Sequence, residues 1–370
     1  MASVQRREGQ TTGRLTRVAR VDIGLPFVTL LILIGGLATL NSAAPSNEFM
    51  RQVAFLGGGV VIIALLVWLG KNRLLRFAPH LYVLSVALLV VTFIFGREVN
   101  GAKSWLYIGP LPGFQPSELA KIALILALAT ALHERPIGRL VDYLRVALLA
   151  LPPIGLVLIE PDLGSGLVLM AIAAGLVLVR GVPWKQLLLI VIAVGVAVPT
   201  VVIPNLKPHQ IERLVSFVDP EADPQGSGYQ VIQSTIAVGS GGLTGKGYKA
   251  GTQSQLGFIP YRHTDFIFPV LAEESGFVGS VVLLLLYGLL FWRLLAMAGE
   301  CIYERDQLII VGVTVLIAFQ VIVNMGVTLG MAPVTGITLP LVSYGGTSLV
   351  STLLALTLAF VVHRDRYVDW

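Results

Sequence analysis

The chain has 370 residues, of which 55% are hydrophobic and only 13% are charged, and its mean hydropathy is +0.82. An average soluble protein carries about twice this charged fraction, so the composition excludes a soluble globular protein, a disordered chain and a collagen-like repeat. The single cysteine, Cys301, excludes a disulfide framework and a zinc site built on paired cysteines. These observations indicate a polytopic membrane protein.

Ten mostly apolar runs follow one another along the chain. A bilayer core about 30 Å thick requires about 20 helical residues, and most of the runs approach that length. Because backbone polar groups in lipid must be hydrogen-bonded internally, and no alternating strand pattern is present, we expect the runs to be helices. The predicted fold is therefore all-α, with about ten transmembrane helices and one large outer loop. The predicted spans are residues 23–42, 52–70, 79–95, 117–133, 144–159, 163–180, 186–203, 266–292, 307–331 and 344–363.

The basic residues alternate between the two sides of these runs. With the N-terminus placed in the cytoplasm, most of the 26 Lys and Arg residues fall on cytoplasmic segments, as membrane topology requires. These segments include a basic tail at 1–21, the connection with Arg135 and Arg139, and a C-terminal tail at 364–370. Residues 22–363 are predicted to form one transmembrane domain with both termini inside. The net charge of +5 is thus a topology signal, and nucleic-acid binding is not predicted.

Two segments on the opposite side, at about 96–116 and 204–265, are too long to be simple connections. Long ordered loops on one face usually carry function. The second loop contains GGLTGKG, which resembles a phosphate-binding loop. However, Ser240 stands where the motif needs its first glycine, and Gly247 stands where Ser or Thr should follow the lysine. Nucleotide binding is therefore excluded.

A charged pair opens the run at 117–133, in the string QPSELAK. Glu118 and Lys121 are three residues apart, so they share a helix face and can form an ion pair. We expect Ser117 to cap this helix. Two interpretations stand side by side: a neutralised pair near the interface, or Lys121 holding a substrate anion while Glu118 fixes its position.

Three other carboxylates lie near span boundaries. Asp162, in EPDLGSG, begins a span, where an aspartate is often a helix cap. Glu273 and Glu274 fall about two turns into the run at 266–292. Adjacent carboxylates at that depth need partners, a raised pKa or a water-filled cavity, and their roles stay open at this point.

The string RHTDFIF, residues 262–268, places Asp265 where a polar loop gives way to an apolar run at the outer membrane surface. One interpretation is a helix cap. The functional interpretation is a general base for a substrate whose tail lies in the membrane.

Several long strings resemble the SEDS family (shape, elongation, division and sporulation). They are KSWLYIG, QPSELAKIA, EPDLGSG, DPEADPQGSGYQVIQSTIAVGSGGLTGKG, GTQSQLGFIPYRHTDFIFPVLAEESG and APVTGITLPLVSYGGTS, which occur in the family's order over nearly the whole chain. The string GTQSQLGFIPYRHTDF is more similar to the rod-shape branch of the family than to its division branch.

The resemblance implies ten transmembrane helices and a peptidoglycan glycosyltransferase that polymerises lipid II on the outer face of the cytoplasmic membrane during cell elongation. It implies that Asp265 matches an essential aspartate, that Trp105 matches a tryptophan important to activity, and that Glu118 and Lys121 match a charged pair facing a central cavity. It also implies a class B penicillin-binding protein as transpeptidase partner, together with other elongation-complex proteins. Pro269 stands where relatives often carry alanine, and we expect it to bend the start of its span.

Lipid II carries a diphosphate on a polyprenyl tail, so its polymerase needs an apolar groove and cations near the headgroup. Transfer from an α-linked diphosphate to a β-glycoside inverts the anomeric carbon, and one base, Asp265, suffices for it. A positioned base contributes about 10²–10⁴-fold. Lys121, Arg213 and Arg262 are the candidates for stabilising the leaving diphosphate. No ligand cluster in the sequence establishes a metal site, and a divalent cation (Mg²⁺ or Mn²⁺) that shares this task is an open alternative.

Two other functions compete with the polymerase. A lipid II flippase would account for the number of spans, but transporters place their sites at the midplane, whereas these motifs gather on the outer side. A scaffold without chemistry would leave Asp265 and Trp105 unexplained.

Overall fold

The computed structural model describes residues 22–99, 102–107, 113–133, 138, 140–197, 199–200, 203–223 and 226–368. The predicted N-terminal tail at 1–21, Arg135 and Arg139 lie outside the described residues. Helices account for most of the described chain. They are α1 (Gly24–Ala43), α2 (Ser46–Phe95), α3 (Pro116–Leu132), α4 (Leu140–Ile159), α5 (Leu163–Val179), α6 (Trp184–Ala197), α7 (Pro208–Val218), α8 (Ser227–Ser240), α9 (Thr252–Gln255), α10 (Ile267–Glu300), α11 (Glu304–Thr328) and α12 (Gly346–Arg364).

Short elements complete the chain between these helices. They are the strands β1 (Arg97–Val99) and β2 (Ala102–Trp105) and the 3-10 turns η2 (Ile203–Asn205) and η3 (Pro220–Ala222). The two strands form an antiparallel hairpin in which Arg97 pairs with Trp105.

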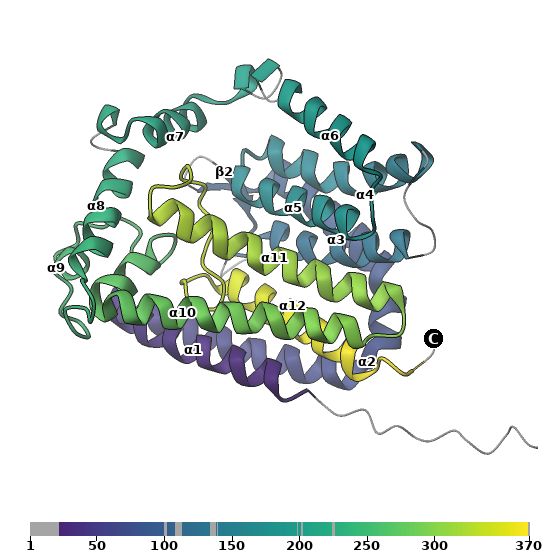
Figure 1. Cartoon of the computed structure of the whole chain (residues 1–370), viewed down its shortest axis with the longest axis horizontal. Coiled ribbons are helices and arrows are strands. Elements are labelled where there is room, and N and C mark those ends of the chain that lie inside the picture. The colour runs from purple at the N-terminus through teal and green to yellow at the C-terminus, as the bar shows by residue number, and fades with distance from the viewer. Residues whose placement is uncertain are drawn as a thin grey trace, which may run out of the picture.

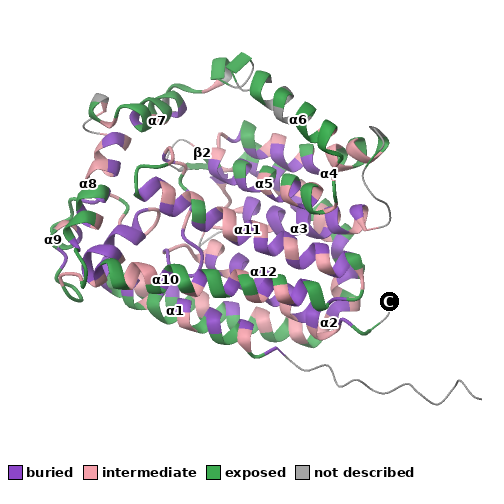
Figure 2. Cartoon of the chain, viewed as in Figure 1, coloured by how far each residue is buried: buried purple, intermediate pink, exposed green. Residues whose placement is uncertain are grey.

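The long helices form one bundle, with α3, α11 and α12 at its centre (Figures 1 and 2). Helix α3 packs against α2, α4, α5, α11 and α12, and most of its residues are buried. Helix α2, in contrast, leaves large apolar side chains exposed, among them Val61, Leu65 and Trp68. Such a broad exposed apolar surface is typical of a protein that meets lipid. Six described helices are long and apolar enough to cross a membrane.

The predicted runs at 52–70 and 79–95 are joined in α2. The helix is continuous over 50 residues except at Gly70, whose φ of 72° and ψ of 167° interrupt it. Only glycine adopts such a conformation readily. The separate loop that the sequence indicates between these runs is therefore replaced by a one-residue break.

Basic residues of several predicted cytoplasmic segments gather at one end of the bundle. Lys71, next to the break, has its Nζ atom 2.9 Å from Oδ2 of Asp306, and both side chains are fully buried. Nearby, Arg366 lies 3.6 Å from Glu300. Cys301 follows α10 in the same region and is only 4% exposed.

Helix α10 is broken at Gly276 (φ 67°, ψ −161°). The predicted bend at Pro269 is not present: Pro269 lies in the first turn of the helix, where a missing N–H costs little. Residues 241–247 enter the break and satisfy its backbone groups, because Phe277 N donates to Gly242 O (2.9 Å) and Lys246 N donates to Glu273 O (3.0 Å).

The two adjacent glutamates of α10 anchor the loop between α8 and α10. Glu273 is fully buried and accepts hydrogen bonds from Lys246 Nζ (2.8 Å), Gln253 N (2.8 Å) and Ser254 N (3.0 Å). Glu274 accepts a hydrogen bond from the Ser42 hydroxyl at the end of α1. Both carboxylates therefore have partners, and the lysine of GGLTGKG is held by Glu273.

The segment that precedes α10 is tied to the segment that precedes α12. The amide of Asn324, on α11, donates to the carbonyls of Asp265 (2.8 Å) and Ile337 (2.7 Å). Ser343 Oγ donates to Thr264 O (2.6 Å), and Tyr344 N donates to His263 O (2.8 Å). The backbone at Asp265 is thus fixed by side chains and backbone from two other parts of the chain.

We predict that Asn324→Leu loosens this junction, because it leaves two buried carbonyls without a donor, each at a cost of about 1–3 kcal/mol. The apparent melting temperature of the purified protein in detergent should fall by several degrees. Thr314→Val, on the same helix, removes a buried hydroxyl that donates only to its own helix at Ile310 O (2.8 Å). A melting temperature lowered no more by Asn324→Leu than by Thr314→Val would contradict the prediction.

Candidate active site

Asp265 lies two residues before the start of α10 and is half-buried. The residue at the N-cap position is Phe266, and no side chain caps the helix there. The helix-cap interpretation of Asp265 is therefore wrong. Its carboxylate faces Gly336 in the segment before α12, where an added Cβ would lie 3.8 Å from Asp265 Oδ2.

The electrostatic surroundings of Asp265 suit a group that exchanges a proton. Burial raises the pKa of Asp265 to about 6, the positive charge of Arg213 opposes this increase, and the negative charge of Asp162 adds to it. Arg213 is half-buried on α7. A carboxyl group with such a pKa is mostly ionised at neutral pH and still basic enough to accept a proton, which is what a general base requires.

Asp162 is the cap of α5, as the sequence predicts. One carboxylate oxygen accepts from Ser165 N (3.0 Å), and the other accepts from the side-chain amide of Gln115 (3.0 Å). The start of α5 also touches the segment before α12: an added Cβ on Gly164 would lie 2.6 Å from Thr335 O. Asp265 and the start of α5, which Asp162 caps, are thus both held next to the segment that contains Thr335 and Gly336.

Glu118 and Lys121 form an ion pair at the start of α3. Lys121 Nζ lies 2.7 Å from Glu118 Oε1, and the two side chains are only 2% and 10% exposed. Ser117 does not cap the helix, since Gln115 holds the N-cap position and no side-chain capping hydrogen bond is formed there. The Ser117 hydroxyl donates instead to Ser165 Oγ (3.3 Å), which brings the starts of α3 and α5 together.

Trp105 and Arg262 lie near this region with fewer contacts. Trp105 is half-buried on β2, whose Lys103 N donates to Glu160 O in the turn between α4 and α5 (3.2 Å). The hairpin therefore lies beside the turn that carries Asp162. Arg262 is half-buried, and its Nη1 atom is buried without a hydrogen-bond partner among the described residues.

The sequence analysis missed Glu160 and Asn324. Glu160 is 1% exposed, its Oε1 atom has no hydrogen-bond partner in the described part of the chain, and burial, with Asp162 adding, raises its pKa to about 8. Its position in EPDLGSG, two residues before Asp162, was the available signal. Asn324 stands in an apolar run, where a polar side chain signals a buried hydrogen-bonding role. Within the described ranges, no three His, Cys, Asp or Glu side chains are grouped so as to hold a metal ion.

The arrangement unites three helix starts and two loops. The base candidate, the capping carboxylate and the buried ion pair come from segments that are far apart in the sequence, and Arg213 supplies a cation from the large loop. This combination can accept a proton at one atom and stabilise an anion close by, which are the requirements of a glycosyl transfer with an anionic leaving group.

Comparisons with known proteins identify the family of the chain. The FtsW, RodA and SpoVE family model, described as "Cell cycle protein", matches residues 15–368. The peptidoglycan glycosyltransferase MrdB of Escherichia coli strain K12 is 36% identical over 349 residues, or 94% of each chain. A probable peptidoglycan glycosyltransferase FtsW of Thiomicrospira cyclica is 38% identical over 353 residues, covering 91% of this chain and 90% of the relative.

Solved structures show the same fold. The rod shape determining protein RodA of Thermus thermophilus is 42% identical, with a TM-score of 0.73, and the match covers 95% of this chain and 99% of that one. A chain from a structure on polymerization and crosslinking by a peptidoglycan synthase complex is 50% identical, with a TM-score of 0.84 and the same coverage. The chain therefore belongs to the SEDS family, whose model is named after FtsW, RodA and SpoVE.

Proposed function

We propose that the chain is a peptidoglycan glycosyltransferase that polymerises lipid II during cell elongation, with Asp265 as the general base. The observation that carries this proposal is the half-buried Asp265, whose pKa is raised to about 6 between the charges of Arg213 and Asp162. The names of the relatives MrdB and FtsW supply the reaction class.

In the proposed step, Asp265 takes the proton of the attacking sugar hydroxyl. The hydroxyl oxygen forms a bond to the anomeric carbon on the face opposite the diphosphate, and the bond from that carbon to the diphosphate oxygen breaks. Undecaprenyl diphosphate leaves as an anion and needs no general acid. Lys121, Arg213 and Arg262 are the cations proposed to stabilise it, and Trp105 and Glu118 complete the substrate-binding region.

The proposed topology has ten membrane crossings with both termini in the cytoplasm, two of the crossings being the halves of α2. The clustering of Lys71, Arg305 and Arg366 at one end of the bundle supports it, since cytoplasmic ends are enriched in basic residues. Asp265 then lies on the extracytoplasmic face. We propose a class B penicillin-binding protein as partner, in keeping with the synthase complex among the similar structures.

Asp265→Asn tests the base directly, because asparagine keeps the shape but cannot accept a proton at neutral pH. Polymer formed from purified lipid II by the protein with its partner, with transpeptidation inhibited, should fall by about a hundredfold or more. Asp219→Asn is the matched control: Asp219 is exposed and caps a turn through Glu221 N (3.2 Å), a bond that asparagine retains.

If Asp265→Asn polymerises at more than roughly a tenth of the wild-type rate, the loss of activity is smaller than the loss expected when a general base is removed. Such a result would contradict the assignment. Movement of labelled lipid II across vesicles, measured on the same preparations, separates the flippase. Loss of translocation with polymerisation intact would favour that function.

The pH dependence of the polymerisation rate should reveal how the charges near Asp265 set its pKa. The rate should decrease as the pH falls through about 6, because the base becomes protonated. This decrease forms the acid limb of the pH–rate profile. Arg213→Gln removes the charge that lowers the pKa and should move this limb to higher pH. Asp162→Asn removes the charge that raises the pKa and should move it to lower pH, while asparagine still caps α5.

Arg76→Gln makes the same change of charge at an exposed residue of α2 and should leave the limb in place. Shifts in the same direction for Arg213→Gln and Asp162→Asn would refute the assignment of the limb to Asp265.

A double charge reversal, Glu118→Lys with Lys121→Glu, tests whether Lys121 contacts the substrate. Either single variant leaves a buried charge unpaired, at a cost of about 3–5 kcal/mol, and should lower the yield of folded protein. The double variant restores the pair and should fold, yet it should polymerise poorly because the cation has moved by one turn. Near-normal polymer yield from the folded double variant would show a purely structural pair.

A further inference from the structure

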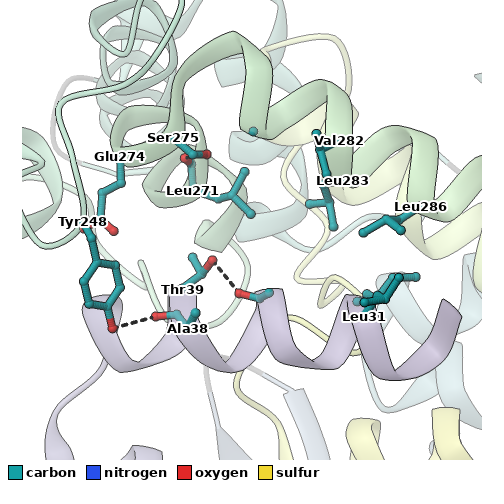
Figure 3. Close-up of a pocket in the computed structure, with 13 residues that line it drawn as sticks. Leu31, Ala38, Thr39, Tyr248, Leu271, Glu274, Ser275, Val282, Leu283 and Leu286 are labelled. Carbon is teal, nitrogen blue, oxygen red and sulfur yellow. Dashed lines mark hydrogen bonds between the residues drawn. The ribbon is translucent and has the colours of Figure 1, made fainter. Parts of the chain in front are cut away.

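A recess of about 390 Å³ lies between α1 and α10, away from Asp265 (Figure 3). Leu31 of α1 faces Leu283 and Leu286 of α10 across it, and the loop residue Tyr248 stands at one end. Gly35 and Val282, which also line it, are exposed, so the recess opens on the lateral surface of the bundle. This volume lies within the range of small-molecule sites, about 300–1,000 Å³.

Most polar groups around the recess are already hydrogen-bonded to the protein. The hydroxyl of Thr39 donates to Gly35 O (2.9 Å) and that of Ser275 to Leu271 O (2.6 Å). Tyr248 donates to Ala38 O (3.2 Å). These groups therefore add little polarity to walls that are otherwise aliphatic, and the recess fits a hydrocarbon chain.

Glu274 differs from these groups. It is only 7% exposed, and it lines the recess beside Tyr248 (Figure 3). Its Oε1 atom takes the hydrogen bonds of Ser42 and Gln255, whereas Oε2 accepts none from the residues that the structure describes. This oxygen keeps contact with solvent, and a ligand with charged N–H groups at this end of the recess could donate a charge-assisted hydrogen bond to it.

A cation lies over the ring of Tyr248, which lines the recess together with Glu274. Lys249 is exposed, and its Nζ atom lies 5.6 Å from the centre of the Tyr248 ring. The end of the recess thus combines a fixed anion and a nearby cation above an apolar channel. A phosphatidylethanolamine molecule has the complementary order of groups: an ammonium with three N–H donors, a phosphate two carbons away, and acyl chains.

We propose that this recess binds phosphatidylethanolamine, with one acyl chain between α1 and α10, the ammonium on Glu274 and the phosphate near Lys249. Phosphatidylcholine has no N–H donor for Glu274, and phosphatidylglycerol has no cation. The proposal goes beyond the polymerase function and does not depend on it or on the side of the membrane that carries Asp265.

The test measures lipid bound to the full-length protein by native mass spectrometry, after transfer from mixed micelles that contain phosphatidylethanolamine, phosphatidylcholine or phosphatidylglycerol with identical acyl chains. Phosphatidylethanolamine should be retained at least about tenfold better than the other two, the preference that one charge-assisted hydrogen bond provides. It should also raise the melting temperature, because a ligand that binds only the folded state stabilises it.

Two variants test the binding of the acyl chain and of the headgroup separately. Gly35→Phe should fill the recess and abolish retention, and the helix has room for the start of the new side chain, because a Cβ at Gly35 meets nothing within 4 Å. Gly288→Phe is the control: Gly288 is exposed on α10, equally open and outside the recess, and this variant should retain the lipid. Glu274→Gln keeps the shape and should reduce the preference for phosphatidylethanolamine over phosphatidylcholine to near equality.

Equal retention of the three lipids by the wild type, or stronger retention of phosphatidylglycerol, would overturn the proposal. Full retention by Gly35→Phe would overturn the place of the acyl chain, and an unchanged lipid preference in Glu274→Gln would overturn the role of the carboxylate. If Gly35→Phe lowers the melting temperature more than Gly288→Phe does, the decision rests on Glu274→Gln.

Discussion

A helix that breaks within an apolar bundle must find partners for the backbone groups that the break releases, because lipid offers none. In this protein the loop at 241–247 provides them at Gly276, and Glu273 then secures the following residues through Lys246 and two backbone amides. The first part of α10 and the large loop consequently form one unit. Asp265 lies just before this unit, and its backbone is held by Asn324 of α11, while its neighbour Thr264 is held by Ser343 in the segment before α12.

The same requirement explains why the site lies where it does. Polar chemistry inside the bundle would have to be satisfied by the chemical groups of the bundle itself, whereas at the helix starts the free N–H groups and loops already form a hydrogen-bonded layer. Asp162, Gln115 and the pair of Glu118 and Lys121 all belong to helix starts. The half-buried Asp265 is desolvated enough to gain basicity and close enough to Arg213 to remain mostly ionised at neutral pH.

The sequence predicted the helical runs, the cap at Asp162 and the pairing of Glu118 with Lys121, because these depend on local periodicity and spacing. It did not predict the break at Gly276, which depends on a loop about 30 residues away filling it. Ser117 and Asp265 carried the signature of helix caps, yet Gln115 and Phe266 hold those positions, since the chain direction at a helix start is set by packing. The roles of Glu273 and Asn324 were equally hidden, because their partners lie in other segments.

The burial of Cys301 has a practical consequence for experiments on this chain. Its thiol is 4% exposed, and burial raises its pKa to about 12, so the reactive thiolate is almost absent at neutral pH. Since it is the only cysteine in the sequence, the unmodified protein is already a nearly silent background for thiol-directed probes. Spin labels, fluorophores or impermeant maleimides attached to single introduced cysteines can therefore report on loop motion, distances and sidedness without first replacing a buried residue of the bundle.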